Sequence, residues 1–272
     1  MQTIIEPGRT SGHYWRDLWE YRELFQVLAW RDFAVRYRQT IIGILWAVLR
    51  PLLTVLILTV IFGRVAKLPG EGDAPYALMV LAGMLPWMFF STAVTDAANS
   101  VVTNANLVGK VYFPRLIVPV AATMVSIIDL LIGLVILAVM MAGYQYAPTW
   151  QILLLPVWIV LAFLATLGPG LWITAVNVRY RDFRYVIPFV VQFGLYVSPV
   201  GFAFSRIPEK WQFLYSLNPM VGVINGFRWS ILGQQAPLYE QSIIISCVII
   251  AGMLWLGIRQ FRKLEKSFAD VI

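Results

Sequence analysis

Residues 116–141 read LIVPVAATMVSIIDLLIGLVILAVMM, an almost unbroken apolar run with a single carboxylate at Asp129. A bilayer core about 30 Å thick needs about 20 apolar residues per helix, so this stretch is long enough to cross a membrane. Hydrophobic residues make up 60% of the 272-residue chain and charged residues only 13%, with a mean hydropathy of +0.74. Soluble domains carry about 25% charged residues. The sequence therefore predicts an all-α integral membrane protein with several spans.

The apolar runs predict six membrane spans, with an interrupted segment between the fifth and the sixth. The predicted spans are residues 41–62, 76–98, 116–143, 152–176, 186–204 and 242–258. In the stretch 199–238 the apolar pieces are too short to cross a bilayer, and they are broken by Pro199, Pro208, Pro219 and Gly222. Because irregular backbone at membrane depth must be surrounded by protein or water, we expect two short re-entrant helices within 205–238. An outer loop that carries an amphipathic helix is the alternative.

Basic residues gather on one side of this arrangement and set its predicted orientation. Only five fall on the side away from the N-terminus: Arg64, Lys67, Arg206, Lys210 and Arg228. Since cytoplasmic loops carry the excess of Lys and Arg, the terminal segments 1–40 and 259–272 are both predicted to be cytoplasmic. The first forty residues carry charges and no early apolar core, so we expect no cleavable signal peptide.

Residues 13–38, HYWRDLWEYRELFQVLAWRDFAVRYR, precede the first span and follow a different pattern. Leu18, Tyr21, Phe25 and Leu28 recur at helical spacing, and charged residues fill much of the rest. This pattern favours an amphipathic helix that lies in the membrane interface. A soluble helix that packs on a partner protein is the alternative.

The stretch NLVGKVYFPR, residues 106–115, separates two spans with two basic residues and the pair Tyr112–Phe113. The predicted topology places it in a cytoplasmic loop. Pro114 then starts the next helix, where its missing N–H costs nothing. Lipid contact does not explain aromatic side chains on a cytoplasmic turn, whereas contact with a partner protein does. A plain basic loop is the alternative.

Five stretches together carry a resemblance that covers nearly the whole chain. They are RYRQTIIGILWAVLRPLL (36–53), YALMVLAGMLPWMFF (76–90), NANLVGKVYFPRLIVPV (104–120), NVRYRDFRYVIPFVVQ (177–192) and LEKSFADVI (264–272). In combination they resemble the membrane subunits of ABC-2 type polysaccharide exporters, which serve O-antigen, capsule or teichoic-acid export. One departure is Arg50, where such proteins more often carry Asn or another uncharged residue before the proline.

The resemblance implies a homodimer of this subunit with two separate ATPase subunits, which would bind ATP and Mg, in the bacterial inner membrane. It implies a lipid-linked polysaccharide as substrate. We expect no nucleic acid partner, and no cofactor or metal on this chain. A separate ATPase is consistent with the sequence, which contains no G-x-x-x-x-G-K-[ST] phosphate loop.

The same resemblance implies which residues contact the ATPase. They are Asn106, Leu107, Lys110, Val111, Tyr112, Phe113 and Arg115, with a second contact at Arg181 and Asp182. Phe113 is expected to be the aromatic anchor that seats in a groove of the ATPase. For Asp182, an ion pair with a neighbouring arginine is the alternative.

Arg50 and Asp129 are predicted to lie deepest in the spans among the ionisable residues. At about 1.5 Å per residue, Arg50 lies about 14 Å from residue 41, and Asp129 about 20 Å from residue 116. Ionisable groups at such depth usually face a bundle interior or a water-filled cavity. Three interpretations remain open: an Arg50–Asp129 ion pair, a role of both in lining the conduit, and an Arg50 that reaches the inner headgroups.

Aromatic residues in and near the spans are candidates for stacking on sugar rings, whose C–H faces are apolar. They are Trp46, Tyr76, Trp87, Phe89, Phe90, Trp172, Tyr196 and Phe202. Trp and Tyr also gather at bilayer interfaces without touching a substrate, and that is the alternative for each residue.

These observations predict the channel-forming subunit of an ATP-driven exporter, with no enzyme activity on this chain. The alternatives are an ABC-2 permease for a smaller lipid or drug, a membrane-embedded glycan transferase, and a scaffold. A transferase needs acid and base residues clustered at one membrane face, and the sequence shows no such cluster. The single histidine, His13, and the single cysteine, Cys247, are far apart and give no metal site. Charged residues within the spans argue against a pure scaffold.

Overall fold

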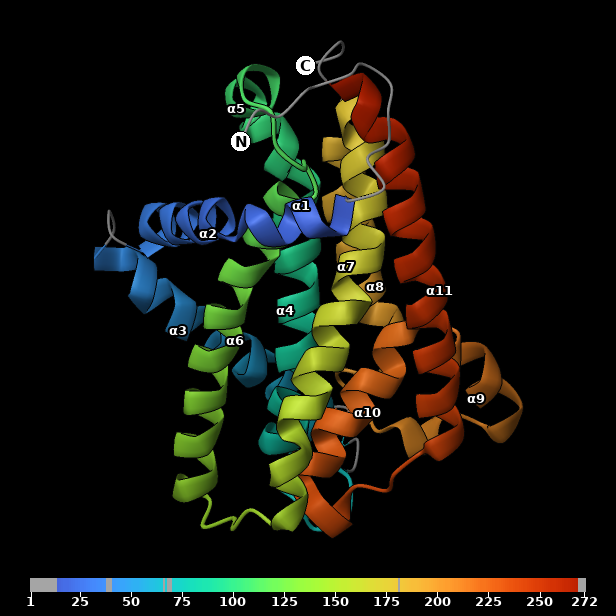
Figure 1. The fold of residues 1–272 in the computed structure, drawn as a ribbon. Helices are drawn as coiled ribbons and strands as arrows, with labels where there is room; N and C mark the ends of the chain where they lie inside the picture. The colour runs from blue at the N-terminus through green and yellow to red at the C-terminus, as the bar shows by residue number, and fades with distance from the viewer. Residues whose placement is uncertain (1–13, 38–40, 66, 68–69, 181, 269–272) are drawn as a thin grey trace.

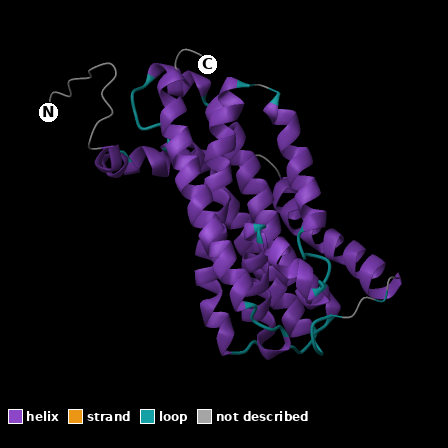
Figure 2. Cartoon of the chain, turned by 90° about the vertical axis from the view of Figure 1, so that its right-hand side faces the viewer, coloured by secondary structure: helices purple, strands orange, loops and turns teal. Residues whose placement is uncertain are grey.

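The computed structural model describes residues 14–37, 41–65, 67, 70–180 and 182–268, and all regular elements in these ranges are helical. Figure 2 shows helices joined by short loops, as the predicted all-α class requires. The helices are α1 Tyr14–Glu20, α2 Arg22–Tyr37, α3 Ile41–Leu58, α4 Tyr76–Thr103, α5 Ala105–Lys110, α6 Ile117–Gly143, α7 Leu155–Arg179, α8 Phe183–Val197, α9 Glu209–Ser216, α10 Pro219–Leu232 and α11 Glu240–Leu264. A π-helical segment, Thr59–Val65, continues α3, and a 3-10 turn, Trp150–Leu154, leads into α7.

Five helical stretches in the described ranges are long and apolar enough to cross a membrane. They are Leu45–Val65, Tyr76–Thr103, Ile117–Gly143, Trp150–Arg179 and Glu240–Leu264. Each overlaps a predicted span, so the chain is a multi-pass membrane protein. The count of six is not confirmed, because the predicted span 186–204 corresponds to the shorter helix α8.

Helix α8 ends early for a local reason. It has 15 residues, which at 1.5 Å per residue gives about 22 Å, less than the thickness of a bilayer core. Ser198 follows α8 with φ −87° and ψ 147°, the extended backbone that a residue before a proline favours. The turn at Pro199 therefore stops the apolar helix before it reaches the predicted length.

Helix α4 forms the centre of the bundle. It packs against α6, α7, α10, α3 and α8. In the apolar part of α4, 78% of the residues are buried, against 11% in the span that contains α3. Figure 1 shows the long helices running side by side, with α1 and α2 lying across them. The body of the molecule is thus α4, α6, α7, α10 and α11, and α3 is peripheral.

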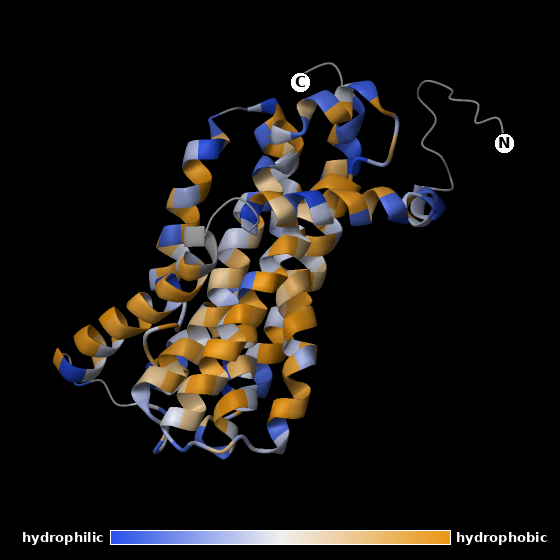
Figure 3. Ribbon diagram, turned by 90° about the vertical axis from the view of Figure 1, so that its left-hand side faces the viewer, coloured by the Kyte–Doolittle hydropathy of each residue, from blue (hydrophilic) through white to orange (hydrophobic). Residues whose placement is uncertain are grey.

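The two ends of the bundle carry different segments. Figure 1 places α5, the last turn of α7 and the end of α11 at one end, which we call the α5 end. The connections from α6 to α7 and from α10 to α11 lie at the opposite end. Figure 3 shows hydrophobic residues along the length of the bundle and hydrophilic residues gathered at the α5 end.

Helix α10 lies inside the bundle although it is short. Asn218 caps its start by accepting a hydrogen bond from the Met220 backbone N–H at 3.0 Å, and Gly233, at φ 61°, ends it. Apart from Trp229, all its residues are buried. Arg228, which the sequence analysis counts among the basic residues of the outer side, is one of these buried residues.

Four groups surround the buried Arg228 guanidinium. It donates hydrogen bonds to the backbone oxygens of Met79, Val200 and Phe202 at 3.3, 2.8 and 2.9 Å, and it lies 4.0 Å from the Glu71 carboxylate. A side chain at Gly83 would meet Arg228 at 2.8 Å, so a glycine is needed there. Arg228 therefore joins α10 to α4 and to the turn after α8.

Helices α7 and α11 approach each other through glycines. A Cβ atom at Gly257 would lie 2.2 Å from the backbone oxygen of Gly168, and one at Gly168 would lie 2.7 Å from the Met253 backbone. Small residues at such crossings allow membrane helices to pack backbone against backbone. Gly252, on the same helix as Gly257, faces open space.

We predict that Gly257→Ala lowers the thermal stability of the detergent-purified chain, since the added methyl group forces α7 and α11 apart. Overpacking of this kind costs about 1–3 kcal/mol. Gly252→Ala is the matched control and should be neutral or slightly stabilising, because Ala favours a helix over Gly. Equal melting temperatures for the two variants would contradict the close crossing.

Candidate functional site

The turn that joins α4 to α6 projects from the α5 end of the molecule. Helix α5 begins where α4 ends at Asn104, and it stops at Val111, whose backbone is extended with φ −120° and ψ 135°. The predicted contact residues of this turn differ in how exposed they are. Exposed are Asn106, Lys110, Val111 and Tyr112; Leu107 and Arg115 are half-buried, and Phe113 is buried.

Phe113 is not available as the predicted anchor for a partner protein. Only 5% of its surface is exposed, and it packs in a cluster with Leu28, Val108, Phe261 and Phe268. Tyr112, by contrast, is 61% exposed. The sequence could not decide between two adjacent aromatic residues, because the direction of the turn is set by the packing of α2 and α11 beneath it. Tyr112 is the aromatic side chain that the turn presents.

Arg115 ties the turn to the segment after α11. Its guanidinium donates a hydrogen bond to the backbone oxygen of Glu265, whose carboxylate accepts one from the Tyr14 hydroxyl at 3.0 Å. The Arg262 guanidinium lies 4.5 Å from the centre of the Tyr14 ring. Burial raises the pKa of Glu265, and burial together with Glu265 raises the pKa of Tyr14. These contacts fix α1, the turn and the end of α11 to one another.

A cavity of about 610 Å³ opens between the turn, the start of α1 and the end of α11. Its lining is mixed in character, with charged residues and the apolar face of the turn. The lining residues are Tyr14, Asp17, Val108, Gly109, Lys110, Val111, Tyr112, Phe113, Pro114, Arg115, Arg262, Glu265 and Lys266.

The second predicted contact lies before α8. Asp182 is exposed and forms no ion pair within the described part of the chain, and Arg181 lies outside the described residues. The alternative of an Asp182 ion pair therefore finds no support among the arginines that the structure describes.

A half-buried ion cluster joins helix α2 to two spans. The Arg36 guanidinium lies 2.5 Å from Asp96 of α4 and 3.1 Å from Asp129 of α6. The Tyr37 hydroxyl donates a hydrogen bond to Asp129, and the Ser126 hydroxyl donates one to Asp96 at 3.0 Å. We call this arrangement the Arg36 clamp.

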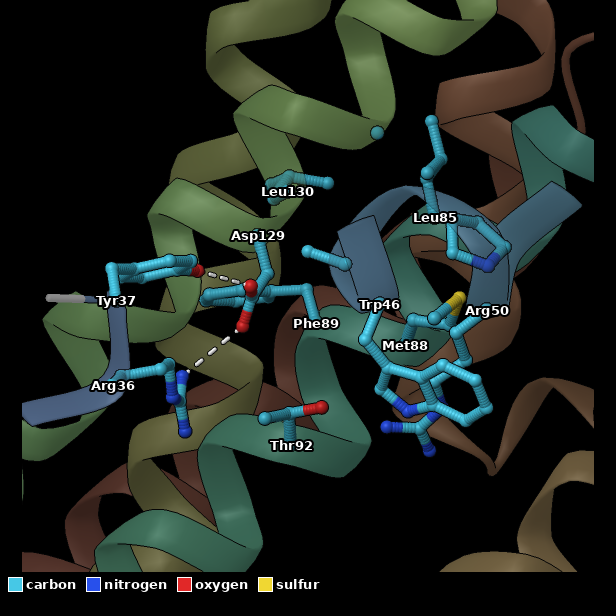
Figure 4. Close-up of a pocket in the computed structure, with 13 residues that line it drawn as sticks. Arg36, Tyr37, Trp46, Arg50, Leu85, Met88, Phe89, Thr92, Asp129 and Leu130 are labelled. Atoms are coloured by element: carbon cyan, nitrogen blue, oxygen red, sulfur yellow. Dashed lines mark hydrogen bonds and ion pairs between the residues drawn. The ribbon is translucent and has the colours of Figure 1, made fainter. Parts of the chain in front are cut away.

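The predicted Arg50–Asp129 ion pair is wrong, since Asp129 pairs with Arg36 instead. Figure 4 shows the Asp129 carboxylate turned toward Arg36 and Tyr37, with Arg50 on the other side of the pocket. The sequence predicted a partner for Asp129 only from the residues inside the spans. Helix α2 brings an arginine to the same depth from outside them.

Arg50 and Asp129 nevertheless line one cavity, of about 290 Å³, at the junction of α2, α3, α4 and α6. Trp46 and Phe89, two of the aromatic candidates, also line it. A second cavity of about 400 Å³ lies between α3, α4 and α8, and it is lined by Arg50 and Trp87 among others. Arg50 thus lines both cavities.

The other aromatic candidates are spread over the fold. Trp172 and Tyr196 are exposed. Phe90 is half-buried against Trp87, with ring centres 5.4 Å apart, and Phe202 packs against Tyr215 at 6.4 Å. The Tyr76 hydroxyl donates a hydrogen bond to the Gly201 backbone oxygen. The structure therefore brings only Trp46, Trp87 and Phe89 together around the cavities at Arg50.

The sequence interpretation missed Arg36, Tyr37 and Asp96, which form most of the clamp. A signal for them existed, because Asp96 lies inside the predicted span 76–98, and a carboxylate there needs a basic partner. Within the described residues, no group of three or more His, Cys, Asp and Glu side chains could hold a metal ion.

Comparison with known proteins places this arrangement in a class of membrane transport proteins. The model of the ABC-2 type transporter family matches residues 23–232, from α2 to the end of α10. That range is most of the chain, so the chain belongs to the ABC-2 type transporter family.

Relatives with assigned roles are similar over nearly their whole length. An O-antigen export system permease protein of Myxococcus xanthus is 26% identical over 94% of this chain and 98% of its own length. One of Klebsiella pneumoniae is 26% identical over 92% of this chain and 95% of its own. A capsule polysaccharide export inner-membrane protein of Neisseria meningitidis is 24% identical over 87% of this chain and 90% of its own.

We predict that alanine substitutions at the two neighbouring aromatic residues of the turn differ strongly in their effect on stability. Phe113→Ala empties a site in a packed cluster, which typically costs about 3–5 kcal/mol. Tyr112→Ala removes an exposed side chain and should change stability by less than about 0.5 kcal/mol. Thermal unfolding of the two purified variants measures the difference. Loss of stability from Tyr112→Ala, with Phe113→Ala unaffected, would reverse our assignment of the two side chains.

Proposed function

We propose that this chain is the permease subunit of an ABC transporter that exports a lipid-linked polysaccharide, such as O-antigen, across the bacterial inner membrane. The observation that carries this proposal is the similarity to O-antigen and capsule export permeases over almost the whole length of both chains. The membership of residues 23–232 in the ABC-2 type transporter family supports it.

The energy for export comes, in this proposal, from two separate ATPase subunits that bind ATP and Mg and dock on a homodimer of this chain. The exposed residues of the turn, Lys110 to Tyr112, provide the first contact, and Asp182 lies in the second. Since Arg115, Glu265 and Tyr14 tie the turn to α1 and the end of α11, movement of the ATPase would reach all three segments together.

The α5 end faces the cytoplasm in this proposal. Arg179 ends α7, and Arg262 and Lys263 lie in the last turn of α11, so basic residues accumulate at the end where α5 projects. Cytoplasmic segments of membrane proteins carry this excess of positive charge. Both termini would then be cytoplasmic.

We further propose six crossings, with α9 and α10 as re-entrant helices from the outer side. Helix α10 has 14 residues, too few to span a bilayer, and it is nevertheless buried among α4, α7 and α11. Short helices are tolerated at membrane depth where protein surrounds them. Helix α8 and the turn after it, up to Ala203, complete the fifth crossing.

We predict that Tyr112→Ala uncouples the permease from its ATPase without unfolding it. Aromatic anchors of interfaces often contribute about 2 kcal/mol or more, so recovery of the ATPase with the tagged permease should fall about tenfold or more, and surface glycan should be lost. Tyr144→Ala is the matched control, because Tyr144 is also exposed, at 52%, but follows α6 in the connection to α7, which lies at the opposite end.

Co-purification of the ATPase and display of glycan on the cell surface are the two measurements. Undiminished ATPase recovery and normal glycan display with Tyr112→Ala would contradict the docking of the ATPase on this turn. Normal ATPase recovery with the wild-type chain, but no dependence of surface glycan on it, would instead favour a permease for a smaller lipid or drug.

A further inference from the structure

Arg50 occupies an unusual place for a cation. It lies in the apolar helix α3, one residue before the buried Pro51, and its side chain is exposed toward two cavities of about 290 and 400 Å³. An ionisable residue at membrane depth costs at least a few kcal/mol unless an anion or water compensates it. The charge of Arg50 therefore needs an anionic group or water beside it.

The protein itself supplies no partner to Arg50 within the described residues. The one carboxylate among the described residues that line the 290 Å³ cavity, Asp129, is bound by Arg36 and Tyr37. Figure 4 shows Asp129 facing these two residues, across the pocket from Arg50. The Arg50 side chain is left without a hydrogen bond or an ion pair in the part of the chain that the structure describes.

The lining of the 400 Å³ cavity has the groups that a phosphoryl-binding site needs. Among the described residues that line it, Arg50 is the one charged group. Ser91 and Gln192 add hydrogen-bond donors that the described residues leave unused, whereas Thr54 and Thr95 donate to backbone oxygens at 2.8 Å. The rest of the lining is apolar: Met84, Trp87, Met88, Pro188, Val191 and Leu195.

The combination of one guanidinium, a few neutral donors and an apolar wall fits a particular kind of ligand. Guanidinium groups bind phosphate oxygens with paired hydrogen bonds. The apolar wall suits the hydrocarbon chain that a phospholipid or a lipid phosphate carries. A neutral glycan would leave the charge of Arg50 uncompensated.

We propose that Arg50, with Ser91 and Gln192, binds the phosphoryl group of an anionic lipid in the cavity between α3, α4 and α8. This rests on the proposed function, under which the lipid is the phosphorylated linker of the exported polysaccharide. The headgroup of a bilayer phospholipid offers the same chemistry, and the experiment separates the two sources.

The experiment measures lipid binding to the full chain in nanodiscs of neutral phosphatidylcholine. Farnesyl diphosphate is the probe for a phosphorylated linker, farnesol is its uncharged counterpart, and phosphatidylglycerol added to the nanodiscs is the probe for a headgroup. Native mass spectrometry and microscale thermophoresis give the bound stoichiometry and the Kd. The variants are Arg50→Gln, Arg50→Lys and Gln192→Ala, with Arg64→Gln as control, because Arg64 is exposed in the segment after α3.

We expect Arg50→Gln to weaken diphosphate binding about tenfold or more, the usual effect of losing charge-assisted hydrogen bonds. Arg50→Lys and Gln192→Ala should weaken it less, and Arg64→Gln should not. Farnesol binding should be the same in all variants. If Arg50→Gln does not fold, the graded losses in Arg50→Lys and Gln192→Ala still test the site.

Arg50-dependent binding of the diphosphate assigns the site to the linker, and Arg50-dependent binding of phosphatidylglycerol alone assigns it to a headgroup. If none of the variants changes the binding of either probe, the proposal is overturned, and Arg50 is then a counter-charge to the clamp. Surface glycan display that persists after deletion of this chain would refute the proposed function, whereas unchanged probe binding in the variants would refute the site alone.

Discussion

A single guanidinium determines how the peripheral helices sit on the bundle. Two spans carry carboxylates, Asp96 in α4 and Asp129 in α6, that cannot remain uncompensated at membrane depth. Arg36 of α2 pairs with both, at 2.5 and 3.1 Å. This contact fixes the position and the direction of α2 on the bundle, and hence the point where α3 starts. It also occupies Asp129, which leaves Arg50 facing the cavities beside α3.

Different polar contacts stabilise the two ends of the molecule, on either side of the packed centre of the bundle. At the α5 end, Arg115 and Tyr14 bind Glu265, and these contacts join the turn, α1 and the end of α11. At the opposite end, Arg228 is buried among backbone oxygens of α4 and of the turn after α8. Helices α3 and α8 are less enclosed, and the cavities lie beside them. A movement that starts at the turn would thus reach these helices through α2 and the clamp.

The spans were largely predictable from the sequence, whereas the contacts between them were not. Apolar runs locate five spans to within a few residues, because hydrocarbon thickness fixes their length. The predicted span 186–204 is not confirmed, since the helix there, α8, ends at Val197 before the proline at 199. Hydropathy carries no information on which of Tyr112 and Phe113 points inward, or on which arginine meets Asp129. Both depend on how α2 crosses the bundle, and that is a tertiary property.

The most direct test of this account is a double-mutant cycle between Arg36 and Asp129, measured by thermal unfolding of the purified chain. Arg36→Gln alone leaves both carboxylates without an ionic partner, and Asp129→Asn alone leaves Arg36 with Asp96 as its only carboxylate in the clamp. If the clamp holds α2 against the spans, the double variant should lose less stability than the sum of the single variants, by roughly 0.5–3 kcal/mol. Strictly additive losses for this pair, together with coupling between Arg50 and Asp129, would contradict the account.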